Sequence, residues 1–332
     1  MIPARILGTG SYLTGRRIST RELCERAVPD RDPELMQQRI GISNRYWVEP
    51  GVTAAETATE ALSRALQRAG IEASDLSRII FVSSTGGDSL IPGTAHHVCQ
   101  RLGLDDTCDA FDINNSCAGF LTGLDTAARA VATGMGPVGV VAGEIFSRYL
   151  PVEKPRPYLV MGDAAGAAVI APGEGRARLL ASHLRSALDM RLEVTMAHPG
   201  LLEHTEHKTS NGDTFLRFDA SYKALTDSAL HALEESSRAV LESAGMSLDD
   251  VAWFLPHQPN GRMLDIILER MGVSPERTEA VVDEIGSVGA ASIPVSLDQL
   301  MRNGRVRAGD HILMTAVGAG TGYGALLFQV GP

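Results

Sequence analysis

The sequence has little of two things, basic charge and aromatic side chains. Lys and Arg together number 30 against 40 Asp and Glu, which gives a net charge of −10. Because phosphate binding requires a basic surface, nucleic acid is not expected as the main partner, and an acidic partner would need a local basic patch. Aromatic residues make up 5% of the chain while glycine occurs 34 times, so we expect tight packing of small side chains.

Cysteine is also scarce. Cys24, Cys99, Cys108 and Cys117 are the only four in 332 residues, and no CxxC pattern occurs. This number and spacing fit neither a disulfide framework nor a usual zinc site, so the sequence predicts no bound metal. A reduced, cytoplasmic setting is the simplest expectation.

Long apolar runs are almost missing. The N-terminal residues lack the charged segment and long apolar core of a signal peptide. Residues 312–332 carry no charge over 21 positions, which is long enough to span a bilayer, but five glycines interrupt them. We therefore expect two buried strands around a glycine turn and no membrane span.

What the sequence does contain is a helix followed by a buried strand, and this order occurs twice. A helix is predicted over Ala54–Ala69, with Gly70 as its stop and a strand at 79–82 after it. About 175 positions later, a helix that begins near Leu225 leads to a strand at 253–255.

The repeat continues beyond these first elements. Residues 116–125 resemble residues 289–298, and each segment leads to an apolar strand, at 138–142 and at 312–316. Helices that alternate with apolar strands predict an α/β fold with largely parallel sheets.

A repeated α/β unit predicts two similar halves that share one core. We place the N-terminal half at residues 1–172 and the C-terminal half at residues 173–332. The more polar residues 184–224 are predicted to form an excursion between the halves, as a lid or a substrate wall.

Cys117 is the first candidate for chemistry. It lies in the segment 111–120, where an apolar strand passes through small polar residues into a helix. At a helix N-terminus, backbone N–H groups and the helix dipole stabilise a thiolate, so we expect a lowered pKa. The alternative is a buried cysteine that acts as a small hydrophobe.

His257 and Ser287 are the second and third candidates. His257 follows a predicted strand, between two prolines, and the carboxyl ends of parallel strands are where ligands bind in such sheets. A hydrogen-bonded turn histidine is the alternative. Ser287 lies in a glycine-rich turn that matches the Cys117 turn in the repeat, so all three should converge on one central pocket.

Several weaker patterns favour structural explanations. Residues 8–10 (GTG) are only a fragment of a dinucleotide loop, without the third glycine. Residues 203–207 (EHTEH) resemble metal ligands, but solvent-facing side chains are the simpler interpretation. His96 and His97 are expected on a helix. Asp163, in a sharp turn before a strand, is expected to hold loops together.

Together these motifs resemble the β-ketoacyl-acyl-carrier-protein synthase III family of the thiolase-like superfamily, nearly from end to end. The resemblance rests on four boxes in family order: 116–120, 162–166, 256–260 and 286–294. It implies an α/β thiolase-like fold of αβαβα layers, usually in a homodimer. It also implies that Cys117 takes an acyl group from coenzyme A or from a carrier protein.

One position departs from the family. Its members work with a Cys, a His and an Asn; Cys117 and His257 match, but Ser287 stands at the Asn position. In the condensing enzymes the His and the Asn hold the thioester oxygen while a malonyl-thioester loses CO₂. A serine hydroxyl is shorter than an Asn amide, so the resemblance implies thioester chemistry at Cys117 but leaves condensation in doubt.

The resemblance assigns roles to further positions. Arg39 matches an arginine that contacts coenzyme A, but Leu35 stands where a Trp often stacks on adenine. The remaining implied positions are Arg156 and Asn260 for the cofactor, Arg262 for an acidic carrier protein, Ile91 for the acyl pocket across the dimer, and Gly318 and Gly320 for the oxyanion loop.

Three functions remain open. The first is a ketosynthase that joins the acyl group on Cys117 to a malonyl-thioester. The second is a transferase that passes the acyl group to an oxygen or nitrogen of a specialised metabolite. The third is an inactive partner subunit, although Cys117 and His257 are both retained. In each case we expect an acyl thioester or acyl carrier protein as partner, and no permanently bound cofactor.

Overall fold

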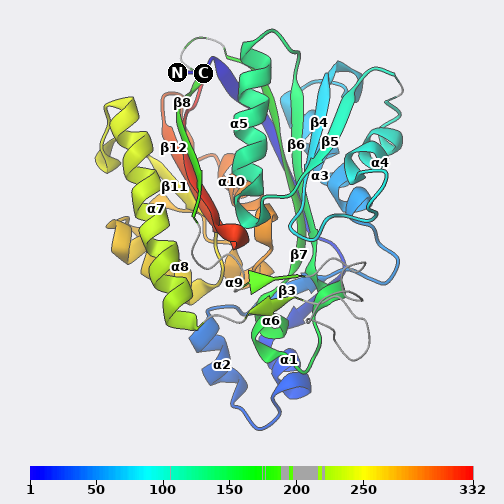
Figure 1. The fold of residues 1–332 in the computed structure, drawn as a ribbon, viewed down its shortest axis with the longest axis vertical. Helices are drawn as coiled ribbons and strands as arrows, with labels where there is room; N and C mark the ends of the chain where they lie inside the picture. Colours follow the sequence, from blue (N-terminus) through cyan, green and yellow to red (C-terminus); the bar gives the residue numbers. More distant parts are fainter. Residues whose placement is uncertain are drawn as a thin grey trace.

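Two β-sheets lie beside each other in the computed structural model, with helices between them and on their outer faces (Figure 1). The structure describes residues 1–104, 106–173, 175, 177–187, 194–196, 216–218 and 221–331.

The first sheet has the strand order β1-β7-β6-β4-β5. Its strands are β1 (Ala4–Tyr12), β4 (Arg78–Val82), β5 (Asp109–Ile113), β6 (Val138–Ile145) and β7 (Asp163–Pro172). Strand β4 pairs in parallel with β5 and β6, while β7 is antiparallel to β1 and β6. The carboxyl ends of β4, β5 and β6 therefore share one edge, and β5 leads directly to Cys117.

The second sheet has the strand order β11-β12-β13-β8. Its strands are β8 (Arg178–Ser186), β11 (Trp253–Pro256), β12 (His311–Gly318) and β13 (Gly322–Gln329). The charge-free C-terminal run forms β12 and β13 around a glycine turn, as predicted. In the part of the chain that the structure describes, no helix is long and apolar enough to cross a bilayer.

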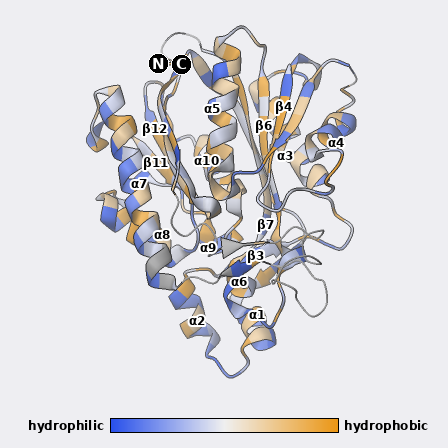
Figure 2. Ribbon diagram, in the orientation of Figure 1, coloured by the Kyte–Doolittle hydropathy of each residue, from blue (hydrophilic) through white to orange (hydrophobic). Residues whose placement is uncertain are grey.

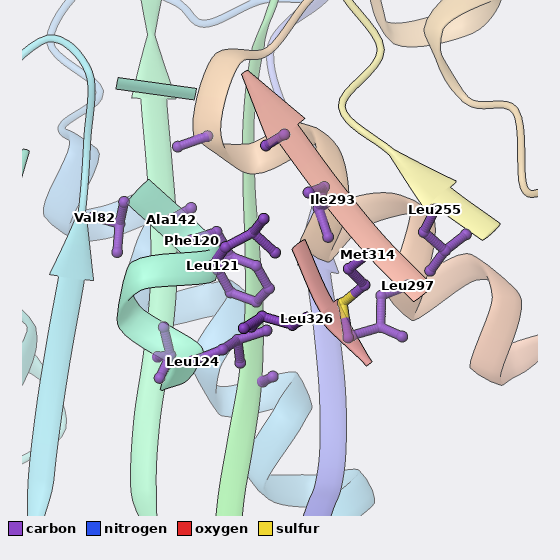
Figure 3. Close-up of a cluster of buried hydrophobic side chains, with 14 of the residues drawn as sticks. Val82, Phe120, Leu121, Leu124, Ala142, Leu255, Ile293, Leu297, Met314 and Leu326 are labelled. Atoms are coloured by element: carbon purple, nitrogen blue, oxygen red, sulfur yellow. The ribbon is translucent and has the colours of Figure 1, made fainter. Parts of the chain in front are cut away.

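Helices α5 (Gly119–Ala132) and α10 (Ser292–Arg302) lie between the two sheets. Their apolar faces form the central core with side chains of both sheets (Figure 3). Phe120 and Leu124 of α5 meet Leu326 of the second sheet, and Ile293 and Leu297 come from α10. These side chains are almost fully buried, so the core joins the two halves.

The outer helices complete the layers. On the first sheet lie α3 (Ala54–Ala69) and α4 (Thr94–Arg101), and on the second lie α7 (Tyr222–Ala244) and α8 (Gly261–Met271). Leu62 of α3 belongs to one buried cluster with Phe81, and Val240 of α7 belongs to another with Phe254. Hydrophobic residues line the inward faces and polar residues the outward ones (Figure 2). The αβαβα layering confirms the predicted architecture.

The Gly-Thr-Gly segment has a packing role. A Cβ at Gly8 would lie 2.4 Å from the Ala65 carbonyl oxygen, and one at Gly10 would lie 2.1 Å from the Ala61 carbonyl oxygen. These glycines therefore let β1 lie directly against α3. The helix has the predicted bounds, and Gly70 ends it in the left-handed conformation with φ 69°.

The structure follows the predicted repeat. In chain order, α3, β4, α5, β6 and β7 of the first half match α7, β11, α10, β12 and β13 of the second half. Short 3₁₀ turns precede both central helices, η2 (Ser116–Ala118) before α5 and η7 (Gly289–Ala291) before α10. Ser116 and Gly289 open these turns with φ 47° and 51°.

Smaller elements form one end of the molecule, at the bottom of Figure 1. They include α1 (Thr20–Ala27), α2 (Pro33–Ile40), α6 (Pro155–Val160), α9 (Val282–Ile285), β2 (Arg16–Ser19), β3 (Asn44–Trp47), β9 (Val194–Thr195) and β10 (Arg217–Phe218). Most of the predicted excursion, with the 203–207 segment, lies outside the described residues.

Candidate active site

The turn η2 presents Cys117 at the start of α5. Ser116 takes the left-handed conformation, and its N–H donates to Asn114 Oδ1 at 3.2 Å. A Cβ at Gly119 would lie 2.6 Å from a methyl group of Val82, so a glycine is needed for the helix to begin against β4. Cys117 is half-buried and unbonded to another cysteine. The predicted strand-to-helix placement is therefore observed.

The expected direction of the Cys117 pKa is wrong. Burial, together with the negative charge of Glu144, raises the pKa of Cys117 to about 12. Hydrogen bonds from the Ser116 hydroxyl and from the backbone oppose this shift but are smaller. Since desolvation disfavours the charged form and outweighs these hydrogen bonds, the resting residue is a thiol that needs a base.

His257 follows β11 directly and is held in place. Its backbone N–H donates to the Thr315 carbonyl of β12 at 2.8 Å. The next residue, Gln258, fixes the turn, because its side chain accepts from the backbone N–H groups of Val281 and Val282 at 3.0 and 3.1 Å.

The imidazole of His257 is suited to accept a proton. The residue is 6% exposed, and burial lowers its pKa to about 4, so the ring is neutral at pH 7. Its Nδ1 has no hydrogen-bond partner among the described residues.

Ser287 lies in a turn that two backbone hydrogen bonds fix. Its N–H donates to the Val160 carbonyl, and its carbonyl accepts from the Gly162 N–H, both at 2.9 Å. Gly286 before it has φ 72°, where a side chain would be strained. Ser287 is 5% exposed, and its hydroxyl makes no hydrogen bond within the described ranges.

The three candidates lie on or next to elements that meet along β12 and η7. Turn η2 contacts both β12 and η7, the turn that follows Ser287, while His257 is bonded to β12. A Cβ at Gly318 would lie 2.7 Å from the Cys117 nitrogen, so a glycine is needed for this approach. The Ala319 N–H donates to the Ser116 hydroxyl at 3.2 Å. Gly318 and Gly320 thus belong to the loop beside Cys117.

The outlying candidates lie on exposed elements. Arg39 at the end of α2 and Arg262 at the start of α8 are both exposed. The two helix ends touch, because a Cβ at Gly41 would lie 2.7 Å from Gly261 Cα. Arg156 is exposed on α6.

Three other sequence candidates have different surroundings. Asn260 caps α8 and accepts from the Met263 N–H at 2.8 Å, so its side-chain oxygen has a structural partner. Ile91 is 90% exposed. Asp163 accepts hydrogen bonds from Val48 and Ser147, which confirms its predicted role in joining loops.

Sequence reasoning missed Glu144. This residue is fully buried near the end of β6, and burial raises the pKa of its carboxyl to about 7. It accepts hydrogen bonds from Ser83, Ser84 and Ala290. The sequence feature that could have indicated Glu144 is a single acidic residue near the end of an otherwise apolar strand.

Two family models and a similar protein that match this chain indicate one family. Residues 111–187 match the family 3-oxoacyl-[acyl-carrier-protein] synthase III, and residues 241–330 match its C-terminal domain. A β-ketoacyl-[acyl-carrier-protein] synthase III of Rhizorhabdus wittichii is 35% identical over 97% of this chain and 98% of the relative.

Solved structures agree with this comparison. The 3-oxoacyl-[acyl-carrier-protein] synthase III of Aquifex aeolicus has a TM-score of 0.87 at 29% identity, over 98% of this chain and 99% of that one. The priming β-ketosynthase of the R1128 polyketide pathway has a TM-score of 0.89 at 29% identity, over 99% and 97%. The fold is therefore thiolase-like.

Proposed function

Because this chain belongs to the 3-oxoacyl-[acyl-carrier-protein] synthase III family, we propose that it transfers acyl groups through a thioester on Cys117. The family places it among the thiolase-like ketosynthases, an enzyme group of the transferase class. The observation that supports the thioester most is that the elements next to Cys117, His257 and Ser287 meet along β12 and η7.

The first step starts from the neutral Cys117 thiol and the neutral His257 imidazole, the forms that their pKa values favour. As Cys117 Sγ attacks the carbonyl carbon of the donor thioester, its proton passes to the His257 imidazole. The bond to the donor sulfur then breaks, and that thiolate takes the proton from His257. Backbone N–H groups of the η2 and Gly318 loops would stabilise the negative carbonyl oxygen.

The donor is an acyl-coenzyme A or an acyl carrier protein. Arg39 and Arg262 lie on touching helix ends, and with Arg156 they could form the local basic patch that an acidic chain needs for an acidic carrier. Leu35 is exposed at the position where a Trp often stacks on adenine, which favours the carrier protein as donor.

The family makes a malonyl-thioester the first candidate for the acceptor. Loss of CO₂ would leave an enolate, whose carbon attacks the acyl group and releases Cys117. The enolate oxygen needs hydrogen-bond donors, and removing one preorganised donor costs about 10²–10³ in rate. His257 can supply one donor, and a second must come from Ser287 or from a water molecule.

A second candidate acceptor is a hydroxyl or amine of a specialised metabolite. The short, hydrogen-bond-free hydroxyl of Ser287 favours it, because this transfer requires only a base for the incoming nucleophile. His257 can act as that base. The retained Cys117 and His257 argue against an inactive partner subunit.

Mass spectrometry tests the proposal directly. Incubation with short- and medium-chain acyl-CoA, or with the corresponding acyl carrier protein, should add one acyl mass on the peptide that contains Cys117. The acylated protein is then given malonyl-CoA or a small alcohol, and the product identifies the acceptor class. An adduct of equal amount in Cys117→Ala would contradict the assignment.

A further inference from the structure

Glu144 is a buried acid for which the proposed reaction has no use. It is 0% exposed, in a strand whose residues are all buried. A carboxylate is costly to bury unless hydrogen bonds compensate for its lost water. The partners of Glu144 therefore indicate what this residue does.

These partners come from both halves of the chain. From the loop after β4, the Ser84 hydroxyl and N–H donate to Oε1 at 2.6 and 2.9 Å, and the Ser83 hydroxyl donates to Oε2 at 3.1 Å. From η7 in the other half, the Ala290 N–H donates to Oε1 at 3.1 Å. One carboxylate thus links the two halves beside the candidate site.

The carboxylate also packs directly against η7, the turn that follows Ser287. A Cβ at Gly289 would lie 2.9 Å from Glu144 Oε1, so the turn has no room to shift toward β6. Ala290, which the carboxylate holds, lies three residues after Ser287, and η7 in turn contacts η2 with Cys117.

We infer that Glu144 is a positioning residue of this site, which fixes the Ser287 turn and places a negative charge beside Cys117. The inference rests on the proposed function only in its second test below. Around Glu144, η2 contributes Cys117 and η3 (Phe146–Tyr149) contributes Tyr149. Burial is the main cause of the raised pKa of both groups, and the negative charge of Glu144 adds to it, as the smallest contribution for Tyr149. The Ser83–Ser84 loop and η7 contribute only hydroxyl and amide groups.

The first test measures how the Glu144 charge affects the reactivity of Cys117, and it needs no acyl substrate. Glu144→Gln and Glu144→Met both keep the side-chain length and remove the charge. At about pH 9 the alkylation of Cys117 by iodoacetamide should be roughly threefold to tenfold faster in both variants, because the rate follows the thiolate fraction.

Two controls accompany the alkylation. Cys108, read in the same digest, is the reference thiol, and Asp163→Asn, a buried acid on the neighbouring strand, should leave the Cys117 rate unchanged. If Glu144→Met does not fold, Glu144→Gln alone decides this test. Alkylation of Cys117 at the parental rate in Glu144→Gln would overturn the inferred charge effect.

The second test measures positioning. Each protein is first acylated, and the decay of the acyl-enzyme is followed with malonyl-CoA, or with water if malonyl-CoA gives no product. Both variants lack the charge, but Gln keeps an acceptor for the Ala290 N–H and Met does not. Glu144→Met should therefore slow this decay by about tenfold relative to Glu144→Gln, while the two variants acylate at similar rates.

The positioning role would be overturned if the acyl-enzyme decayed at the same rate in the parent, Glu144→Gln and Glu144→Met. It would also be overturned if Glu144→Met slowed acylation as much as decay. A parent protein that forms no acyl adduct would contradict the proposed function instead, and the alkylation test would still decide whether Glu144 acts on Cys117.

Discussion

At the scale of single residues, the site is defined by what burial does to charge. Desolvation raises the pKa of Cys117 to about 12 and lowers that of His257 to about 4. Both shifts favour the neutral forms, so the resting pair is a thiol and an imidazole. An ion pair of thiolate and imidazolium would require the opposite shifts.

The neutral pair predicts a specific pH dependence for the free enzyme. Alkylation of Cys117 by iodoacetamide should rise throughout from about pH 6 to pH 10, and by about tenfold per pH unit above about pH 8, where Glu144 is already ionised. Peptide mass spectrometry over this range measures it. A rate that is already constant near pH 7 would indicate the ion pair.

Ser287 gives the second prediction at this scale. Ser287→Asn should raise malonyl-CoA decarboxylation by the acylated enzyme, by up to about two orders of magnitude, because a second donor worth about 3 kcal/mol becomes available. Release of CO₂ from labelled malonyl-CoA measures it, with the acylation rate as an internal control. Parental rates already typical of ketosynthases, without a gain in Ser287→Asn, would remove the support for the transferase alternative.

At the scale of elements, the same turn occurs twice, and in η7 it binds a carboxylate oxygen. Ser116 and Gly289, at matching positions of the repeat, open η2 and η7 with nearly equal φ angles. In η7 the next residue, Ala290, donates its N–H to the Glu144 carboxylate. The matching N–H in η2 belongs to Cys117, so the second half provides an internal precedent for an oxygen anion at this place.

The loop opposite η2 is expected to be sensitive to any side chain. In Gly318→Ala the new Cβ would lie 2.7 Å from the Cys117 nitrogen, so the two backbones must separate. We expect acylation to slow by at least tenfold. Gly139→Ala is the matched control on a core strand, where the nearest atoms belong to the movable Leu62 side chain. Similar acylation rates in both variants would contradict the assigned role of the Gly318 loop.

The helices and strands could be predicted from the sequence more reliably than the buried charges and their effects on pKa values. The bounds of α3 and the order of the repeat follow from local periodicity and glycine stops, which neighbouring residues determine. Glu144 could not be found this way, because its partners Ser84 and Ala290 lie far apart in the chain and meet only in the fold. The pKa direction of Cys117 failed for the same reason, since both the burial and the nearby charge are tertiary.

At the scale of the whole molecule, the first sheet ends in a strand whose outer edge pairs with no strand among the described residues. Strand β5 pairs with β4 on one side only. Ile91 and Leu90, 90% and 70% exposed, follow the neighbouring strand β4 on the loop to α4. Such a free edge beside exposed apolar side chains is a liability in a monomer.

A second copy of the chain would remove this liability, and the family resemblance leads us to expect a homodimer with residues 110–113 at its interface. Phe111→Asp, at the centre of β5, should therefore yield monomers, because it places a charge in the interface core. Arg262→Asp, also exposed but on α8, should remain dimeric. Sedimentation over a wide concentration range measures both, and a parental mass of one chain at every concentration would contradict the dimer. In that case Ile91 would have no neighbouring acyl pocket to enter, and its exposure would need another cause.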